Sequence, residues 1–432
     1  MNKIYIETYG CSNNLTESEI MSGLLEKAGF DIVKTPELSD LIIVNTCIVK
    51  GPTENKIISR LEHFEDTFPK KKLIIAGCAP EGAYTRFTEA IPTASLLSTH
   101  RIKDVARVVQ KTFAGQRVEA LGETADIKLG LPKIRKNPIV DIVPISTGCN
   151  GLCTYCAVRL AKGKLRSYPK DKILREIRES VRIGCKEIWL TAQDTASYGL
   201  DKYSESHLPV LLKEIEKIPG NFKVRVGMMN PHHAHPVLSE LIEAFNGKKI
   251  YKFLHLPIQS GDQAMLHTMN RYYTKTQFEE IVSAFKSAFR VNWWTDVIVG
   301  YPEETEEQFM NSVKLIKILK PDYVNVSKFY SRKGTVAANL PQLPSEMIKR
   351  RSKIMSDLVN NIALEKNRRW IGWTGDILIS EKGKKEGQWI GRNFAYKSIL
   401  INKSGQLLGQ RINVKIRDAS PSGLMGWPLK ED

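Results

Sequence analysis

The sequence lacks a long hydrophobic run. Across its 432 residues, no segment approaches the roughly 20 unbroken apolar residues of a membrane-spanning helix. The first residues, Met1 to Ile6, lead directly into a strand-like run, so we expect no secretion signal. A hydrophobic content of 42% is typical of a globular protein, and we expect no membrane partner.

Cysteine is also scarce, with seven residues in the whole chain. An odd number of cysteines, six of them in positions better explained by metal, does not fit a disulfide framework. We therefore expect a reducing compartment, the cytoplasm. Cys185 follows a predicted helix, and we expect it to be a small packed residue.

Acidic residues are nearly absent from one segment and outnumbered in another. Residues 128–170 hold nine Lys or Arg and a single acid, Asp141, whereas residues 331–432 hold nineteen basic residues against nine acidic ones. The formal net charge is +17, and the rest of the chain is close to neutral. Such concentrated charge favours binding of a polyanion at these two places, with ordinary solubility charge as the alternative.

What the sequence does contain is a run of three close cysteines, Cys149, Cys153 and Cys156, after the strand-like segment 142–146. This C-x3-C-x2-C spacing does not suit paired disulfides, and three thiolates can hold three corners of an iron–sulfur cube. The fourth iron would then be open to a small chelating molecule. A zinc site would need a fourth Cys or His nearby, which the sequence lacks, and buried thiols are the other alternative.

Strand and helix patterns divide the chain into parts. Residues 1–127 alternate strands at 3–8, 41–45 and 73–76 with helices at 15–27, 53–64 and 102–113, which predicts an α/β domain with a parallel sheet. A basic linker, 128–140, leads to residues 141–330, where six strand–helix units predict a partial TIM-like barrel. A connecting helix, 331–368, precedes a small OB-like β-barrel, 369–432, with strands expected at 376–380, 388–392, 397–401 and 411–416.

Each of the three N-terminal strands ends at a cysteine: Cys11, Cys47 and Cys78. Parallel strands present their carboxyl ends at one edge of a sheet, where α/β folds bind ligands. We therefore expect the three thiols to converge on a second cluster that has one open iron. Three buried structural cysteines are the alternative.

Together, these segments resemble the methylthiotransferase family of radical S-adenosylmethionine (SAM) enzymes over nearly the whole chain. The resemblance rests on Tyr-Gly-Cys11, Asn-Thr-Cys47, Ala-Gly-Cys78, the Cys149–Cys156 run, and the stretches 255–261, 295–302 and 329–335. Residues 9–14, 131–138 and 187–191 are closest to the threonylcarbamoyladenosine tRNA branch of archaea and eukaryotes. Since the sequence ends at Lys-Glu-Asp432, we expect no hydrophobic C-terminal anchor, which would resemble the archaeal form.

The resemblance implies that a methylthio group replaces the C2 hydrogen of N6-threonylcarbamoyladenosine at position 37 of tRNA. It implies SAM and two 4Fe–4S clusters as cofactors, and a TRAM-type RNA-binding barrel at the C-terminal end. The partners would be the tRNA anticodon stem-loop and an electron donor such as ferredoxin or flavodoxin, and we expect a monomer. The alternatives are the same chemistry on isopentenyladenosine tRNA or on a ribosomal-protein aspartate, and a non-catalytic iron–sulfur RNA-binding protein.

The resemblance also implies which residues contact SAM. These residues follow predicted barrel strands or lie near the cluster loop: Gln193 and Asp194 for the amino group, Gln259, Ser260 and Arg271 for the ribose or carboxylate, and Val297 and Tyr155 near the adenine. A solvated turn is the alternative for Asp194, and packing is the alternative for Val297 and Tyr155.

RNA contacts are expected from basic residues, and one of those at 133–136, Arg159, Lys162 or Arg166 would pair with the carboxylate of the threonylcarbamoyl group. The candidates are Lys133, Arg135, Lys136, Arg159, Lys162, Arg166, Arg392 and Lys397. Three histidines, His232, His233 and His235, lie in a helix-start turn without a cysteine or carboxylate partner, so we do not expect them to bind metal.

Overall fold

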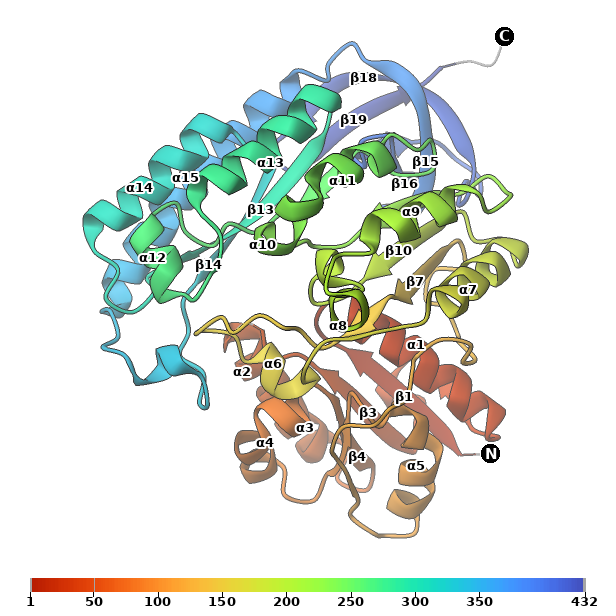
Figure 1. Cartoon of the computed structure of the whole chain (residues 1–432). Coiled ribbons are helices and arrows are strands. Elements are labelled where there is room, and N and C mark those ends of the chain that lie inside the picture. The colour runs from red at the N-terminus through yellow and green to blue at the C-terminus, as the bar shows by residue number, and fades with distance from the viewer. Residues whose placement is uncertain (1, 50, 430–432) are drawn as a thin grey trace.

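The N-terminal part folds around a six-stranded parallel sheet (Figure 1). The computed structural model describes residues 2–49 and 51–429. The strands lie in the order β2-β1-β3-β4-β5-β6, with the bounds β1 (Lys3–Thr8), β2 (Asp31–Val33), β3 (Leu41–Thr46), β4 (Lys72–Gly77), β5 (Ser95–Ser98) and β6 (Glu119–Ala120). The predicted α/β sheet is confirmed.

Helices cover both faces of this sheet. α1 (Ser12–Lys27) and α5 (Val105–Phe113) pack on one face, and α2 (Gly51–Thr67) and α4 (Tyr84–Ala90) pack on the other. Side chains alternate along β3, so Leu41 and Ile43 join the first core and Ile42 and Val44 join the second. Strands β2, β5 and β6 were not predicted, because each is too short to show a hydrophobic period.

The central part is a partial barrel made of two three-stranded parallel sheets. Their orders are β11-β10-β7 and β12-β13-β14, and a parallel bridge between Val224 and Ile250 links them. The strand bounds are β7 (Val140–Pro144), β10 (Glu187–Thr191), β11 (Lys223–Val226), β12 (Phe253–His255), β13 (Asn292–Val299) and β14 (Tyr323–Lys328). Two short antiparallel strands, β8 (Ser146–Thr147) and β9 (Arg166–Ser167), flank the segment that contains Cys149, Cys153 and Cys156, which we call the cluster loop after the expected cluster.

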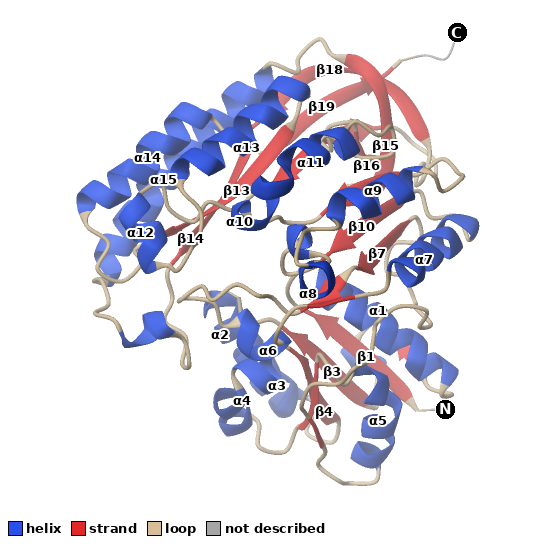
Figure 2. Ribbon diagram, in the orientation of Figure 1, coloured by secondary structure: helices blue, strands red, loops and turns tan. Residues whose placement is uncertain are grey.

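Helices lie outside these strands (Figure 2). They are α7 (Lys170–Arg182), α9 (Leu208–Glu216), α11 (Leu238–Phe245), α13 (Lys275–Ala288) and α14 (Glu306–Leu319), with the shorter α6 (Val158–Lys162), α8 (Leu200–Tyr203), α10 (Pro231–Ala234) and α12 (Gln263–Thr268) between them. Capping boxes start two of the long helices, since Thr274 pairs with Gln277 at α13 and Thr305 with Gln308 at α14.

The C-terminal part is a closed five-stranded barrel in the order β15-β16-β17-β19-β18. Its strands are β15 (Thr374–Lys382), β16 (Gln388–Arg392), β17 (Ser398–Asn402), β18 (Arg411–Ser420) and β19 (Gly423–Pro428). The connecting helix expected at 331–368 is shorter than predicted, because α15 (Ser345–Arg368) starts only after Pro344. The exact domain limits stay a prediction.

Aromatic side chains join the central and C-terminal parts. Tyr396 packs on Tyr251 and Phe253, with ring centroids 4.9 Å and 5.2 Å apart. Lys397 pairs with Asp322 at 2.8 Å, and both side chains are buried. The small barrel is therefore attached through a buried interface rather than through a flexible linker alone.

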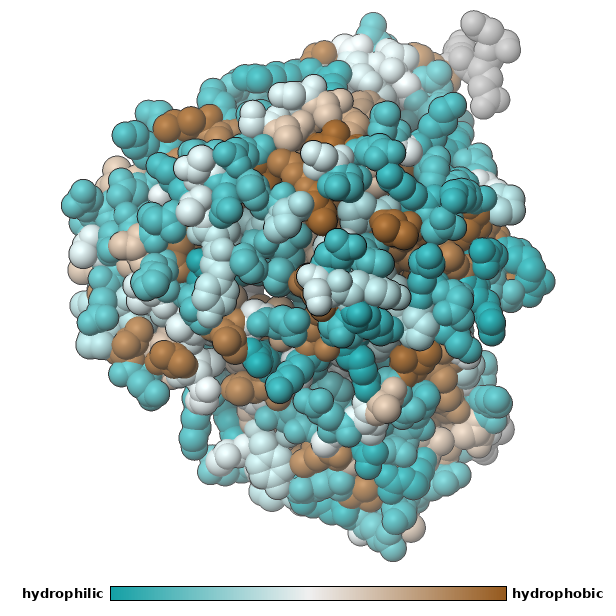
Figure 3. Space-filling model, viewed as in Figure 1, coloured by the Kyte–Doolittle hydropathy of each residue, from teal (hydrophilic) through white to brown (hydrophobic). Residues whose placement is uncertain are grey.

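The surface seen in Figure 3 is mostly hydrophilic, with small separate groups of hydrophobic residues. Among residues 2–49 and 51–429, no helix combines the length and apolar character needed to cross a membrane.

Replacing Trp293 with alanine tests the central core. Trp293 on β13 is fully buried, so Trp293→Ala should lower the free energy of unfolding by about 3–5 kcal/mol in urea titrations. Trp427→Ala is the matched control, because 38% of that side chain is exposed, and it should cost much less. Equal losses for the two variants would contradict the assigned core.

Candidate active site

Three adjacent parallel strands bring Cys11, Cys47 and Cys78 to one edge of the N-terminal sheet. β1 pairs with β3, and β3 pairs with β4, and a cysteine follows the end of each strand. A Cβ added at Gly10 would lie only 2.8 Å from the Cβ of Cys47, so the first two cysteine loops touch. Gly10 also has a φ of +116°, which favours glycine.

Buried asparagines hold these loops together. Asn45 donates from Nδ2 to the carbonyl of Asn14 and to the hydroxyl of Ser18, each at 2.8 Å. Asn14 in turn donates to the carbonyl of Thr46 at 2.8 Å. Sequence reasoning missed both residues as parts of the site, although each lies within three positions of a cysteine.

The N-terminal thiols differ in exposure. Cys11 is exposed and caps α1, whereas Cys47 and Cys78 are buried. Burial raises the pKa of the Cys78 thiol to about 12 and also raises the pKa of Cys47. A thiolate in such surroundings needs positive charge or a metal close by, and a coordinated thiol is deprotonated.

The second set of thiols lies in the loop between β8 and α6. Gly151 is at its centre, because a Cβ added there would lie 3.3 Å from the Sγ of Cys149 and 3.7 Å from that of Cys153. The amide of Gly151 donates to the Sγ of Cys149 at 3.2 Å, and Arg271 donates from Nη1 to the Sγ of Cys153 at 3.4 Å. Donors thus already point at the sulfur atoms, as they would toward thiolates.

The donor sets suit iron–sulfur clusters better than single ions. All seven cysteines are free, and no group of three His, Cys, Asp or Glu side chains in the described ranges surrounds one ion. Each of the two sets supplies three thiols, the number with which cysteine thiolates can hold a 4Fe–4S cube with one iron left open. Cys185 lies in the central hydrophobic core.

Gln193 and Asp194 follow β10 but have different surroundings. Asp194 is buried and already bonded: its Oδ1 accepts from the amides of Ala196 at 3.0 Å and Asn230 at 2.9 Å, and its Oδ2 lies 2.6 Å from Nδ1 of His233. Gln193 Oε1 is buried and has no hydrogen-bond partner among the described residues. Gln193 therefore offers the open acceptor, and the partnership of His233 with Asp194 was not predicted.

The other expected SAM contacts separate into two groups. Arg271 lies beside the cluster loop, and Tyr155, within this loop, packs against the hydrophobic group of Met265, Met269 and Tyr301. The other three residues are parts of the barrel strands and their ends. Gln259 has a left-handed backbone conformation, with φ of +72°, and forms a parallel β-bridge with Val297. Ser260 is fully buried, and Val297 lies in the core. Ser260 and Val297 are thus buried in the fold, and their contact with SAM stays a prediction.

Several expected RNA-binding residues are used inside the protein. Lys133 pairs with Asp141 and Glu176, Lys162 pairs with Glu17, and Lys397 pairs with Asp322. Their side chains are at most 7% exposed, so the expectation that they contact RNA is corrected. Arg135 and Arg392 are also mostly buried and paired, with Asp141 and Glu381.

Three expected cations reach the surface at least in part: Lys136, Arg159 and Arg166. Arg159 on α6 donates from Nη1 to the carbonyl of Gly151 at 3.2 Å, which places it at the cluster loop. Arg166 donates to the backbone carbonyls of Thr124 and Asp126. Of these three, Arg159 lies nearest the thiols.

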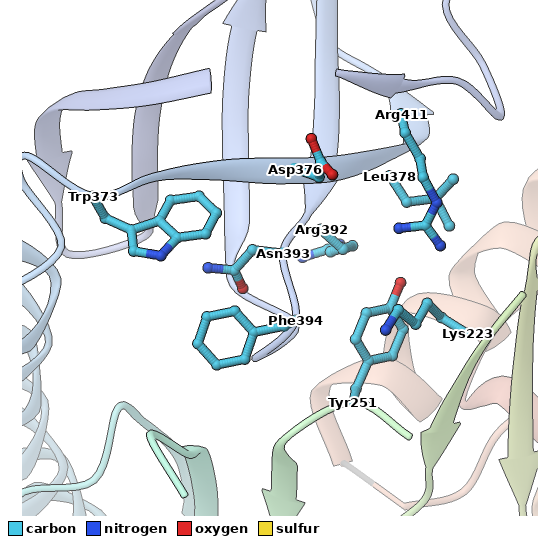
Figure 4. A pocket seen from close by; sticks show the side chains of 9 residues that line it. All are labelled: Lys223, Tyr251, Trp373, Asp376, Leu378, Arg392, Asn393, Phe394 and Arg411. Atoms are coloured by element: carbon cyan, nitrogen blue, oxygen red, sulfur yellow. The ribbon is translucent and has the colours of Figure 1, made fainter. Parts of the chain in front are cut away.

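A hollow of about 240 Å³ lies at the opposite end of the partial barrel, beside the C-terminal barrel (Figure 4). Lys223, the first residue of β11, and Arg411 line one side, while Trp373 and Phe394 line the other. Because α/β barrels place their chemistry at the carboxyl ends of the strands, this hollow is not part of the thiol sites.

Family models match both cysteine-bearing parts of the chain. Residues 3–98 match a model described as uncharacterized protein family UPF0004, and residues 143–316 match the radical SAM superfamily. Solved structures show the same fold at low identity. TsrM, a radical SAM methyltransferase from Kitasatospora setae, gives a TM-score of 0.58 at 13% identity over 78% of this chain and 74% of that one. OxsB, a cobalamin-dependent SAM radical enzyme, gives 0.55 at 12% identity over 84% and 55%.

Curated relatives match over nearly the full length. A probable threonylcarbamoyladenosine tRNA methylthiotransferase of Methanothermobacter thermautotrophicus is 40% identical over 98% of this chain and 99% of its own length. One from Pyrococcus horikoshii is 41% identical over 99% of both chains. The human threonylcarbamoyladenosine tRNA methylthiotransferase is 33% identical over 99% of this chain and 74% of its own. With this similarity spanning both cysteine sites and the C-terminal barrel, the chain belongs to the threonylcarbamoyladenosine tRNA methylthiotransferase family of radical SAM proteins.

Proposed function

We propose that this protein replaces the C2 hydrogen of N6-threonylcarbamoyladenosine, at position 37 of tRNA, with a methylthio group. The pair of three-cysteine sites carries the proposal, because both occur in a chain similar over its whole length to relatives named for this reaction. An aromatic C2–H is not acidic, so no side-chain base near neutral pH can remove its proton. Two bound 4Fe–4S clusters and SAM would supply the one-electron chemistry and the sulfur.

The residues of the central loop would hold the first cluster and orient SAM. Cys149, Cys153 and Cys156 would be its ligands. Gln193 Oε1 is an unpaired buried acceptor, which suits the SAM ammonium. Asp194 would act indirectly, since its hydrogen bonds to Ala196 and Asn230 fix the turn that carries Gln193. Arg271 contributes positive charge beside Cys153.

The N-terminal edge would hold the second cluster through Cys11, Cys47 and Cys78. Cys47 and Cys78 are closed in by the hydrophobic core, and Cys11 is exposed. The open side of the site therefore lies toward Cys11, where a sulfur species and the substrate base could approach. The serine that follows, Ser12, bonds to Thr191 at the carboxyl end of β10, at 2.7 Å. This contact brings the edge of the sheet to the mouth of the partial barrel.

For tRNA, we propose that the anticodon stem-loop binds the exposed cations of the central segment and the C-terminal TRAM-like barrel. The end of β15 and the loop that leads to β16 carry three exposed lysines, Lys382, Lys384 and Lys385. The free cysteines support a reducing compartment, the cytoplasm, and a reductant such as ferredoxin or flavodoxin would supply electrons. We propose that the protein acts as a monomer.

Cysteine variants separate the two sites. The protein reconstituted without oxygen should hold about eight irons, and Cys153→Ala and Cys47→Ala should each hold about four. Cys153→Ala should form no 5′-deoxyadenosine, whereas Cys47→Ala should still form it and transfer no methylthio group. Iron analysis and mass spectrometry measure these outcomes, and four irons in the unaltered protein would refute the second cluster.

Substrate choice tests the threonylcarbamoyl group. Because this group carries a carboxylate that the site would recognise, tRNA that lacks the group should not be turned over. The variant Arg159→Gln should lower kcat/KM on modified tRNA by about tenfold to a hundredfold, as expected for the loss of a charge-assisted hydrogen bond. Lys164→Gln is the matched control, because this exposed lysine lies in the same segment. Equal turnover of isopentenyladenosine tRNA would favour the alternative substrate.

The basic loop of the C-terminal barrel tests RNA binding. Replacing Lys382, Lys384 and Lys385 with alanine should weaken tRNA binding and reduce the slope of log K against log salt by up to about three, because fewer phosphate contacts release fewer counterions. A triple alanine variant at the exposed Lys314, Lys317 and Lys353 removes the same charge elsewhere and should leave the slope unchanged. Identical slopes for both variants would mean that the barrel has another role.

A further inference from the structure

A buried group of charges lies behind the N-terminal thiols. Glu17 on α1 accepts hydrogen bonds from Lys128 at 2.5 Å and from Lys162 on α6 at 2.7 Å. All three side chains are buried, with exposed fractions of 1% for Glu17, 10% for Lys128 and 3% for Lys162. Thr99 donates to the same carboxylate oxygen at 2.6 Å. Two ammonium groups thus share one carboxylate, and the group carries one excess positive charge in the interior.

An excess buried charge is unfavourable unless another charge compensates it. Both lysines approach Oε1 of Glu17, while Oε2 has no hydrogen-bond partner among the described residues. A carboxylate that only neutralised the lysines would be expected to use both oxygens. The arrangement instead indicates that the lysines are drawn to one side of Glu17.

As thiolate ligands of a bound cluster, the cysteine sulfurs would supply negative charge near the lysines. Burial opposes the charged form of Lys162, yet the negative charges of Cys78, Glu17 and Cys11 raise its pKa above the usual range. Burial lowers the pKa of Lys128 to about 8, with Cys78 only a minor opposing influence. Nearby His100 has its pKa lowered to about 4, by burial and then by the two lysines. Ala161, the residue before Lys162, packs in the same hydrophobic core as Cys78, so Lys162 is the lysine that the fold carries to the second set of thiols.

The short helix α6 explains how Lys162 reaches this place. α6 begins two residues after Cys156 and packs against α3 (Ala79–Gly82), the helix that follows Cys78. A Cβ added at Gly82 would lie 3.3 Å from the Cβ of Ala161, and Ala157 and Ala161 share a hydrophobic core with Cys78.

We propose that Lys162 is a positioning residue of the second cluster site, the one whose ligands would be Cys11, Cys47 and Cys78. Its ammonium group, carried by the central barrel, raises the reduction potential of the cluster held there. This inference rests on the two-cluster part of the proposed function. Reduction adds negative charge to a cluster, and a nearby cation in a poorly solvated interior stabilises the reduced state more than the oxidised one.

A second group of charges lies near this site. Arg332 interacts with Cys47 but is paired with Glu54, and Arg86 binds the same carboxylate from a side chain that is 40% exposed. Solvent reaches Arg86 and screens its charge, so this second group is less confined than the one around Glu17. Lys162 also comes from the loop that carries the first set of thiols. The N-terminal site therefore receives this positive charge only when the central barrel packs against the N-terminal sheet.

The test uses the full chain with Cys153→Ala, so that the second cluster is the one that remains. Its midpoint potential is measured by redox titration followed by electron paramagnetic resonance, in the parent and with Lys162→Met, Lys162→Arg or Lys128→Met. Each methionine variant leaves Glu17 with one lysine, so no buried carboxylate loses all its partners. We expect a clear shift to lower potential for Lys162→Met, a smaller shift for Lys128→Met, and a value near the parent for Lys162→Arg.

The outcomes separate the inference from the proposed function. The role of Lys162 is overturned if Lys162→Met binds the full amount of iron and its midpoint potential is unchanged. It is also overturned if Lys128→Met shifts the midpoint potential as much as Lys162→Met or more. Neither result contradicts the two-cluster proposal. Loss of iron from Lys162→Met but not from Lys162→Arg supports the need for a cation, and loss from both overturns the inference in favour of a packing role. A parent that binds no iron refutes the second cluster itself.

Discussion

Burial of thiols is the physical constraint on which the functional part of this structure depends. An apolar environment disfavours a thiolate, as the raised pKa values of Cys78 and Cys149 show. The two thiol sets can therefore be used as anionic ligands only if metal or fixed cations compensate them. The fold supplies such cations at both places, with Arg271 beside Cys153 and Lys162 coupled to Cys78.

The two sites are parts of one unit rather than of two independent domains. α6 starts at the loop of the first thiol set and packs beside the second, and Ser12 contacts Thr191 across the same boundary. Because packed helices deform little, this arrangement sets the distance between the sites. A reaction that needs an electron at one centre and sulfur from the other requires such a fixed separation.

Positive charge in this protein has two uses that the sequence does not distinguish. Lys133, Lys162 and Lys397 neutralise buried carboxylates between parts of the fold, whereas Lys382, Lys384 and Lys385 face solvent. Counting Lys and Arg along the chain treats these groups alike. Only the exposed ones can release counterions from a nucleic acid, so the net charge overstates the surface that can bind RNA.

Local patterns in the sequence determined much of this protein. The apolar run of β3 and the cysteine after each of three parallel strands predicted the sheet and its thiol edge, because strand periodicity and strand direction are local properties. The close spacing of Cys149, Cys153 and Cys156 predicted the first cluster site, because such spacing is also a local property. Contacts between residues far apart in sequence could not be predicted in this way, because they depend on how separate elements pack. Examples are the pairing of Glu17 with Lys162, the pairing of Asp194 with His233, and the burial of Ser260 and Val297. Tertiary structure alone decided which cations are buried and which acceptor stays open, since burial and pairing are set by neighbours from other parts of the chain.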